Sequence, residues 1–248
     1  MKNNITSIIQ LPNTRDTAMK SLRLTGLLAT GLFTVSTQAA LYDRGNGMIY
    51  DDVMDITWLQ DANYAQTSGH DADGLMSWTD ANTWVNGLSY GGYDDWRLPS
   101  ANLINSADPC FAKDGSCDRG FNNSTGELGH MFYTDLDNLG KYGTDGHFQS
   151  GYGVTNSDFI DGISGNSVSI LNLQNSTYWL DEEYAPNTSL AWTFITYSGS
   201  QFRSDKTTTY YSWAIRDGDV SEVPIPAAAW LFGTALLGLA GASRRNRQ

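Results

Sequence analysis

The chain has 248 residues, of which 40% are hydrophobic, and its 27 acidic and 15 basic residues give a net charge of −12. Residues 40–220 contain eight Lys and Arg and twenty-five Asp and Glu, so their net charge is −17. Such a surface excludes generic binding of nucleic acid or sulfated polysaccharide, because polyanions are held mainly through neutralised charges, and it attracts divalent cations.

Residues 1–39 have the pattern of an export signal. Lys20 and Arg23 precede an apolar run over residues 24–35, and small residues follow up to Ala39. A basic start, an apolar centre of this length and a small-residue cleavage site are typical of a signal peptide. We therefore expect cleavage after Ala39 and export of the rest of the chain.

Residues 40–220 have the length of one domain, and their pattern predicts a single compact α+β fold. Two short strands are expected around Gly47, with these residues on their buried face: Met48, Tyr50, Ile56 and Trp58. Alternating aromatic and β-branched residues predict further strands at 177–184, 190–202 (with a turn at 198–200) and 207–217.

Two helices are predicted within the domain. The first covers residues 77–88, where Ser77 is a favourable N-cap with Asp80 three residues later. Four of its apolar residues recur at helical spacing: Trp78, Ala81, Val85 and Leu88. The second covers residues 126–140 and has five apolar residues on one stripe: Leu128, Met131, Phe132, Leu136 and Leu139.

The segment 91–100, Gly-Gly-Tyr-Asp-Asp-Trp-Arg-Leu-Pro-Ser, predicts a strand that ends at its proline. Trp96 and Leu98 would face inward, and Ser100 would cap a following helix. Arg97 follows two aspartates. We favour a local ion pair that pins the strand over an anion-binding role, because most arginine–carboxylate arrangements are structural.

Cys110 and Cys117 are the only cysteines of the chain and have six residues between them. In an exported protein such a pair favours a disulfide. A zinc site would need four ligands at a recognisable spacing, and the sequence has no such set.

The three histidines give no indication of catalysis. His70, His130 and His147 are far apart in the sequence, and none stands in a motif that pairs a base with a nucleophile. His130 precedes Met131 on the predicted second helix, so we expect a packed or surface residue there. We predict that the protein is not an enzyme.

Acidic loops leave calcium binding open. The candidate ligands are Asp71, Asp73, Asp80, Asp181, Glu182, Glu183, Asp217 and Asp219. The loop after His70 does not have the spacing of an EF-hand, since its glycine is misplaced and no acidic residue stands at the twelfth position. Solvated acidic loops are the simpler interpretation in so acidic a chain, and no other metal or cofactor is expected.

The eight Trp and thirteen Tyr residues bear on sugar binding, because sugars stack on exposed aromatic faces. Most of them alternate as core residues do, so burial accounts for them more simply. Four tyrosines near turns or glycines are the better candidates for exposed platforms: Tyr90, Tyr93, Tyr184 and Tyr197.

Residues 227–242 carry no charge and are followed by Arg244, Arg245 and Arg247. Sixteen helical residues span about 24 Å, a little less than the roughly 30 Å of a hydrocarbon core. Trp230 at one end and the arginines at the other match the two interfaces, with the arginines on the cytoplasmic side. We expect a membrane-spanning helix rather than a buried core helix, which would have one apolar stripe.

This tail, residues 221–248, resembles the PEP-CTERM sorting signal of Gram-negative bacteria. Its motif is Val223-Pro224-Ile225-Pro226-Ala227, in which Ile225 replaces the commoner Glu, and the apolar helix and the arginines follow in order. The resemblance implies that the helix anchors the protein in the inner membrane transiently. It also implies that exosortase, a membrane-bound protease, cuts near the two prolines and that the product reaches the cell surface or the extracellular matrix.

Residues 47–219 resemble a second family, the C-terminal domain of the Legionella collagen-like adhesin, long known as a domain of unknown function. The matching residues are Thr57-Trp58-Leu59, the run from Gly92 to Pro99 with Asp95, Trp96, Arg97 and Leu98, then Tyr178-Trp179, Ala191-Trp192 and Ala214-Ile215-Arg216. The resemblance implies a mixed α/β fold distantly related to C-type lectin-like and formylglycine-generating-enzyme domains. The adhesin binds glycosaminoglycans, for which this chain has few basic residues.

These features predict a non-enzymatic exported protein that acts at the cell surface or in the extracellular matrix and binds a polysaccharide or another matrix glycan. Two alternatives stay open. One is an enzyme on a scaffold like that of the formylglycine-generating enzyme, and the other is a structural matrix component without a defined ligand.

Overall fold

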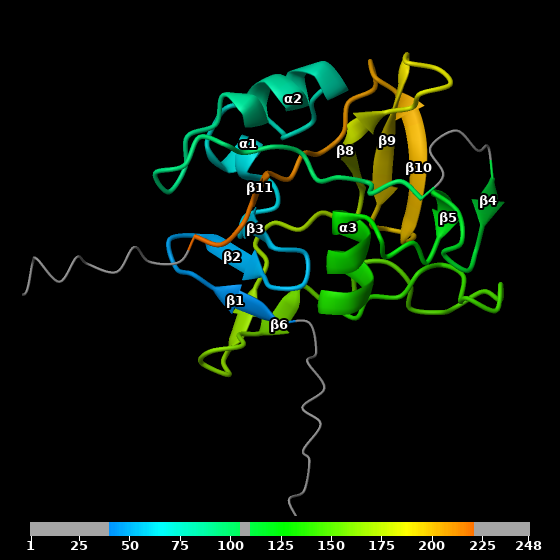
Figure 1. The fold of residues 1–248 in the computed structure, drawn as a ribbon, viewed down its shortest axis with the longest axis horizontal. Coiled ribbons are helices and arrows are strands. Elements are labelled where there is room, and N and C mark those ends of the chain that lie inside the picture. Colours follow the sequence, from blue (N-terminus) through cyan, green and yellow to red (C-terminus); the bar gives the residue numbers. More distant parts are fainter. Residues whose placement is uncertain (1–39, 105–109, 221–248) are drawn as a thin grey trace, which may run out of the picture. The chain divides into compact units, whose positions relative to one another are not determined.

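The computed structural model describes residues 40–104 and 110–220 (Figure 1). The signal peptide expected at 1–39 and the sorting signal expected at 221–248 lie outside these ranges. The described residues carry three sheets and few helices, which confirms the α+β class. Every helix within them is too short or too polar to span a bilayer. The distant relation to C-type lectin-like domains stays a prediction.

The first sheet has the order β1-β2-β3-β11 and brings the two ends of the domain together. Its antiparallel strands are β1 (Leu41–Asp43), β2 (Met48–Asp51), β3 (Ile56–Leu59) and β11 (Ile215–Asp217). Three strands stand where the sequence predicted two, because a second turn, with Asp55 at positive φ, separates β2 from β3. Tyr50, expected in the core, is half-exposed and donates to Asp55 at 2.9 Å, whereas Ile49 is buried.

The second sheet has the order β4-β5-β10-β9-β8. Its strands are β4 (Phe111–Ala112), β5 (Arg119–Phe121), β8 (Thr177–Glu183), β9 (Leu190–Ile195) and β10 (Ser200–Asp205). The strands predicted at 177–184 and 190–202 are confirmed, and the predicted turn between β9 and β10 contains Gly199 at positive φ. A third sheet pairs β6 (Asp158–Ile160) with β7 (Ser167–Ser169).

The strand predicted over residues 207–217 is wrong except for β11. Its backbone bonds to several different parts of the domain in turn, so it cannot follow one ladder. Tyr210 pairs with Met76, Tyr211 accepts from Trp179 of β8, and Ala214 accepts from Leu59 of β3. This crossing segment, residues 210–217, therefore ties the second sheet to the first.

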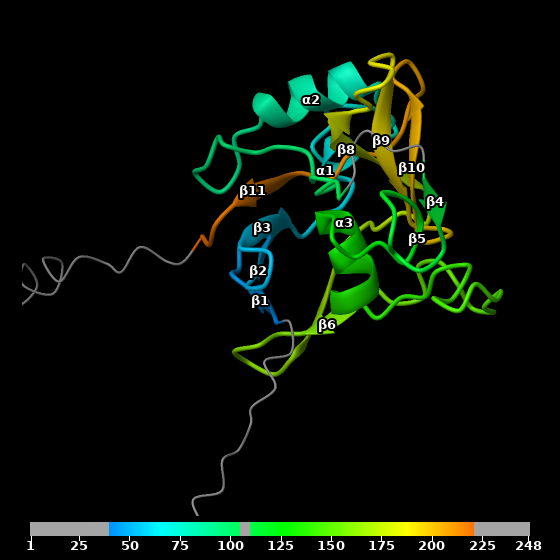
Figure 2. The same ribbon diagram turned by 45° about the vertical axis from the view of Figure 1, so that its right-hand side comes forward.

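The helices are α1 (Tyr64–Thr67), α2 (Trp78–Asn86), α3 (Glu127–His130) and the π-helical turn η1 (Met131–Asp135). α2 begins as predicted, with Ser77 Oγ accepting from Asp80 N, and Gly87 ends it. Figure 2 shows α2 beside β8, where Trp78 Nε1 donates to Leu180 O at 2.8 Å.

The second predicted helix is shorter than its apolar stripe suggested. α3 and η1 end at Asp135, and Asp137 adopts a positive φ that a continuing helix does not allow. Four of the five stripe residues are buried, but Leu139, beyond the end, is 43% exposed.

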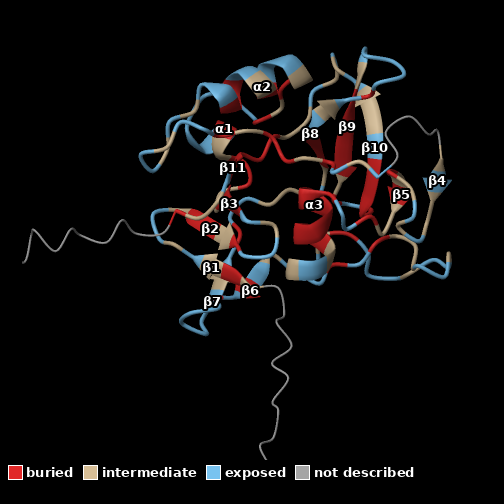
Figure 3. Ribbon diagram, viewed as in Figure 1, coloured by how far each residue is buried: buried red, intermediate tan, exposed pale blue. Residues whose placement is uncertain are grey.

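Tryptophan dominates the core. Strands β8 and β9, which carry Trp179 and Trp192, are largely coloured as buried in Figure 3. The largest fully buried side chains include Trp58, Trp96, Trp179, Trp192 and Trp213. Trp58 and Trp213 pack with ring centroids 4.5 Å apart, and Trp213 Nε1 donates to Leu59 O at 2.6 Å. Burial thus accounts for six of the seven tryptophans in the described ranges, as the alternation predicted, but for only two of the thirteen tyrosines, Tyr178 and Tyr184.

The predicted disulfide between Cys110 and Cys117 is confirmed. It closes the connection from β4 to β5, two short strands that pair in parallel at the edge of the second sheet.

Candidate functional site

The family-motif run from Gly92 to Pro99 is held by Arg97 and by buried apolar side chains. Trp96 and Leu98 face the core as predicted. The strand predicted over residues 91–100 is wrong, because the segment forms only isolated bridges, at Tyr93 and at Arg97. Arg97 forms a bidentate pair with Glu127 of α3 (Nη1–Oε2 2.8 Å, Nη2–Oε1 2.7 Å) and a further ion pair with Asp217 of β11 (2.5 Å). Arg97 therefore forms ion pairs as predicted, but its partners are not the neighbouring aspartates. They lie 30 and 120 residues away in the sequence.

Arg216 engages one of those neighbouring aspartates instead. Its Nε and Nη2 donate to Asp95 Oδ1 and Oδ2 at 2.7 and 2.8 Å, and its guanidinium lies 4.1 Å from the ring centroid of Tyr93. The hydrogen bond from Arg216 lowers the pKa of Asp95. The two motif arginines are thus both engaged within the domain, and this arrangement is structural.

Ser100 caps no helix, because residues 101–104 are irregular. Its hydroxyl instead donates to the carboxylate of Glu182, which also accepts from the backbone of Ala101 at 2.8 Å. Burial raises the pKa of Glu182 even though these donors lower it. Glu182, a calcium candidate, anchors the chain after the motif run.

The other calcium candidates are mostly engaged in local hydrogen bonds or ion pairs. Asp71 accepts from the backbone of Asp73 and Gly74, Asp80 pairs with Ser77, Glu183 pairs with Lys206, and Asp219 pairs with Arg44. Within the described ranges, none of the candidates belongs to a cluster of three potential metal ligands. Calcium binding by these loops stays a prediction.

The four candidate tyrosines have different environments. Tyr184 is buried against Trp192 with Arg203 over its ring at 4.1 Å, so the exposure expected for it is wrong. Tyr93 lies under Arg216. Tyr90 is half-buried, and its hydroxyl donates to Asn46 O at 2.8 Å. Tyr197 is 50% exposed, as predicted for a residue near a turn.

Tyr197 belongs to a larger exposed surface. It lines a hollow of about 310 Å³ together with Phe111 of β4, Tyr152 and Phe202 of β10. Phe148, whose ring centroid is 5.6 Å from that of Tyr152, lines a neighbouring hollow of about 410 Å³. We call these five exposed residues the aromatic face: Phe111, Phe148, Tyr152, Tyr197 and Phe202.

Sequence reasoning missed four members of the aromatic face. Phe148 and Tyr152 lie in an irregular glycine-containing loop, where no periodicity distinguishes exposed from buried positions. Phe202 offered a signal, because it alternates along β10 with the buried Gln201 and must therefore point outward.

The aromatic face has polar groups beside it. Lys141, Ser198 and Ser200 line the first hollow, and Asn138, Asp145, His147 and Gln149 line the second. A concave surface with apolar rings and a few polar groups is typical of small-molecule binding sites. Rings that are exposed on one face can stack on a sugar while the polar groups bond its hydroxyls.

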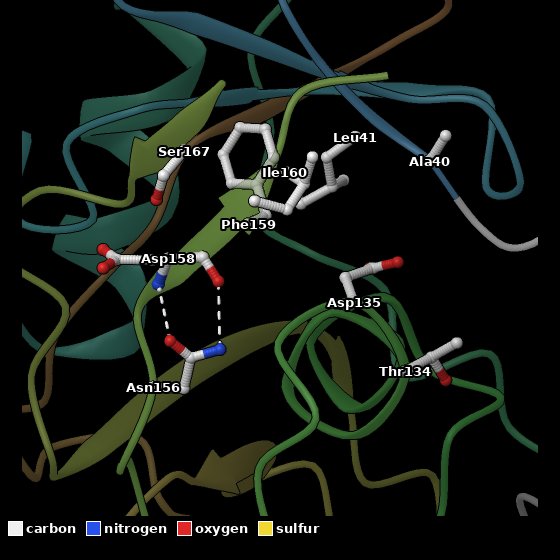
Figure 4. Close-up of a pocket in the computed structure, with 9 residues that line it drawn as sticks. All are labelled: Ala40, Leu41, Thr134, Asp135, Asn156, Asp158, Phe159, Ile160 and Ser167. Atoms are coloured by element: carbon white, nitrogen blue, oxygen red, sulfur yellow. Dashed lines mark hydrogen bonds between the residues drawn. The ribbon is translucent and has the colours of Figure 1, made fainter. Parts of the chain in front are cut away.

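A third hollow, of about 570 Å³, lies between the turn η1 and the strand β6 (Figure 4). Thr134 and Asp135 line it on the side of η1, and Leu41 and residues 158–160 line it from the strands. Asp135 also approaches Asp51 and His130 below this surface. His130 is packed, one of the two environments expected for it, and its Nε2 lies 3.5 Å from Asp135 Oδ1.

Comparison with protein-family models matches residues 47–216 to the Lcl C-terminal domain. This match confirms the resemblance drawn from the motif run, and it covers the described sheets from the turn before β2 to β11. No curated protein and no solved structure matches the chain.

Proposed function

Since the chain belongs to the Lcl C-terminal domain family, we propose that it is an exported, non-enzymatic protein that binds polysaccharide at the cell surface or in the extracellular matrix. The resemblance to the Legionella adhesin domain supports an adhesive role. The signal-peptide pattern and the sorting motif support export and transient anchorage in the inner membrane, with exosortase as the processing partner.

The aromatic face is the observation that carries this proposal. Water-exposed aromatic side chains around a hollow leave apolar area uncovered, and a ligand that covers them gains the free energy of that burial. Sugar rings fit this requirement because they present apolar faces between their hydroxyl groups. The binding strength would depend on stacking rather than on charge.

The charge of the domain narrows the class of polysaccharide. Because residues 40–220 have a net charge of −17, the domain repels sulfated or carboxylated chains at long range. A neutral glycan is therefore the proposed ligand. Lys141, at the first hollow, would donate a hydrogen bond to a sugar hydroxyl.

The enzymatic alternative is a catalyst on a scaffold like that of the formylglycine-generating enzyme. The resemblance implies that such an enzyme would need reactive cysteines. Cys110 and Cys117 are bonded to each other, which supports the binding role over that alternative. A structural matrix component without a ligand is the remaining alternative, and the binding experiment below distinguishes it.

A glycan array probed with the full chain tests the proposal. We expect binding to neutral glycans and a loss of affinity of roughly fivefold in Tyr197→Ala or Tyr152→Ala, since one aromatic–sugar stack is comparable to an aromatic pair of about 1 kcal/mol. Ile163→Ala is the matched control, because Ile163 is also a large apolar side chain, is even more exposed, and lies on the turn between β6 and β7. No binding to any glycan, or equal losses in all three variants, would contradict the proposal.

A further inference from the structure

Asp51, His130 and Asp135 come together below the surface, although they belong to β2, α3 and η1. One oxygen of each carboxylate and one imidazole nitrogen all lie within 4.8 Å of one another. In the part of the chain that the structure describes, this is the one group of three or more His, Cys, Asp or Glu side chains close enough to share an ion.

The facing atoms of this group are buried without hydrogen bonds. Asp51 is fully buried, the Asp135 side chain has no exposed area, and the His130 side chain is 11% exposed. Both carboxylate oxygens of Asp135, Oδ2 of Asp51 and Nε2 of His130 have no hydrogen-bond partner. Since buried polar atoms in folded proteins are nearly always paired, four such atoms at one place favour a ligand that they share.

The group combines two buried carboxylates with one imidazole, whose Nε2 lies 3.5 Å from Asp135 Oδ1. One imidazole can offset at most one of the two negative charges, and a divalent ion shared by the three side chains would neutralise both carboxylates in this buried place.

Backbone hydrogen bonds hold the carboxylate of Asp51 in place. Asp51 Oδ1 accepts from the backbone of Val53 and Met54, both at 3.0 Å, which fixes the carboxylate and leaves Oδ2 available to an ion. Ligands held by outer hydrogen bonds in this way are typical of metal sites.

The turn η1 brings His130 and Asp135 to the same side. In an α-helix, side chains five residues apart point about 140° apart. Here Leu136 N donates to Met131 O, five residues back, at 3.0 Å, and this wider turn places residues five apart nearly in line. π-helical turns occur frequently at functional sites for this reason.

We propose that Asp51, His130 and Asp135 bind one divalent transition-metal ion of the zinc class. The ligands would be Oδ2 of Asp51, the imidazole of His130 and one or both oxygens of Asp135, with water completing the coordination. Such an ion would join β2 to the α3–η1 segment, beside the hollow that Asp135 also lines (Figure 4).

The donor set selects this class of ion. Calcium and magnesium prefer oxygen ligands, and calcium takes six to eight of them. An imidazole with two carboxylates suits zinc, with metal–ligand distances of about 2.0–2.2 Å. The present spacing of up to 4.8 Å between ligand atoms closes around such an ion when the side chains move by about an ångström.

Calorimetric titration of the full chain with zinc chloride, after chelator treatment and without a histidine tag, tests the proposal. We expect one zinc ion per chain, a higher melting temperature with zinc, and much weaker binding of calcium. His130→Gln and Asp135→Asn should each weaken zinc binding by more than the roughly 10–100-fold that an outer-shell partner is worth.

Asp158→Asn is the matched control, because Asp158 lines the same hollow and the substitution removes the same charge without removing a ligand. It should bind zinc like the unmodified chain. Cobalt(II) serves as a spectroscopic probe: its visible absorption should show a nitrogen ligand in the unmodified chain and change in His130→Gln. Absence of stoichiometric zinc binding, equal binding in all variants, or tighter binding of calcium would overturn the proposal.

The variants also separate a loss of ligand from a loss of fold. Asp135→Asn preserves the shape of the side chain and removes a buried charge, so we expect its metal-free form to melt no lower than the metal-free unmodified chain. A variant that is folded but insensitive to zinc supports the site, whereas a variant that gains as much stability from zinc as the unmodified chain contradicts it.

Discussion

Arg97 neutralises Glu127, a carboxylate that has little access to water. The Arg97 side chain is 27% exposed and that of Glu127 is 6% exposed, so removal of the arginine leaves the carboxylate buried without its counter-charge. Glu127 Oε2 also accepts from the backbone of Ser100, and the loss would therefore loosen the chain after the motif run. Arg97 stabilises the domain through this shielding more than through its exposed pair with Asp217.

We expect Arg97→Ala to lower the free energy of unfolding by about 3 kcal/mol, the lower end of the range for breaking a buried pair, because the arginine is partly exposed. Chemical denaturation measures this. Glu127→Gln in the same chain should restore part of the loss, since the unpaired charge is then absent. An Arg97→Ala variant that melts like the unmodified chain but no longer binds glycan would instead make Arg97 a site residue.

At the scale of elements, the β4–β5 connection carries part of the aromatic face at the edge of a sheet. β4 has two residues, and one of them, Phe111, lines the first hollow. So short an edge strand has few ladder hydrogen bonds to hold it. The disulfide that closes this connection therefore positions a residue of the proposed binding surface as well as restricting the unfolded chain.

Replacing Cys110 and Cys117 together by alanine should lower the free energy of unfolding by about 2–3 kcal/mol, the value expected for a short loop. We also expect weaker glycan binding, because Phe111 is then less well placed. Denaturation and the array measure the two effects, and the intact mass should rise by two daltons on reduction of the unmodified chain. A thiol that reacts with maleimide in the native protein would contradict the disulfide.

The sequence predicted the elements that depend on local signals and missed those that depend on distant partners. α2 was predicted because its cap and its apolar spacing lie within twelve residues. The crossing segment was predicted as a strand because its alternation does not show that its hydrogen bonds go to several separate parts of the domain. The ion-binding group was missed for the same reason: Asp51 stands 79 residues before His130 in the sequence, and only the fold brings them together.

At the scale of the whole molecule, two expected sorting segments flank an acidic domain. The apolar run at 227–242 is short for a permanent span, and two prolines precede it. Removal of the tail would also remove three arginines, so the processed protein would be more acidic than its precursor. This difference would increase repulsion between the mature protein and anionic surfaces.

We expect the mature protein to end near Pro226 and to lack residues 230–248 when its host has exosortase. Terminal-peptide mass spectrometry on the surface form measures this. Replacing Pro224 and Pro226 by alanine should leave membrane insertion intact, since insertion depends on the apolar run, but should block the cut. A mature surface form whose last peptide ends in Gln248 would make the tail a permanent anchor.

The crossing segment has a consequence for the order in which the protein is made. Residues 210–217 supply Trp213 to the core and β11 to the first sheet, yet they are among the last to leave the ribosome and, if the chain is exported, the translocation channel. Until they emerge, β3 has no partner on one side. In an exported chain, β1, β2 and β3 would therefore reach the periplasm before their sheet could be completed. The emerging apolar tail then follows within about ten residues, so the final folding step would take place on a chain still tethered beside the membrane.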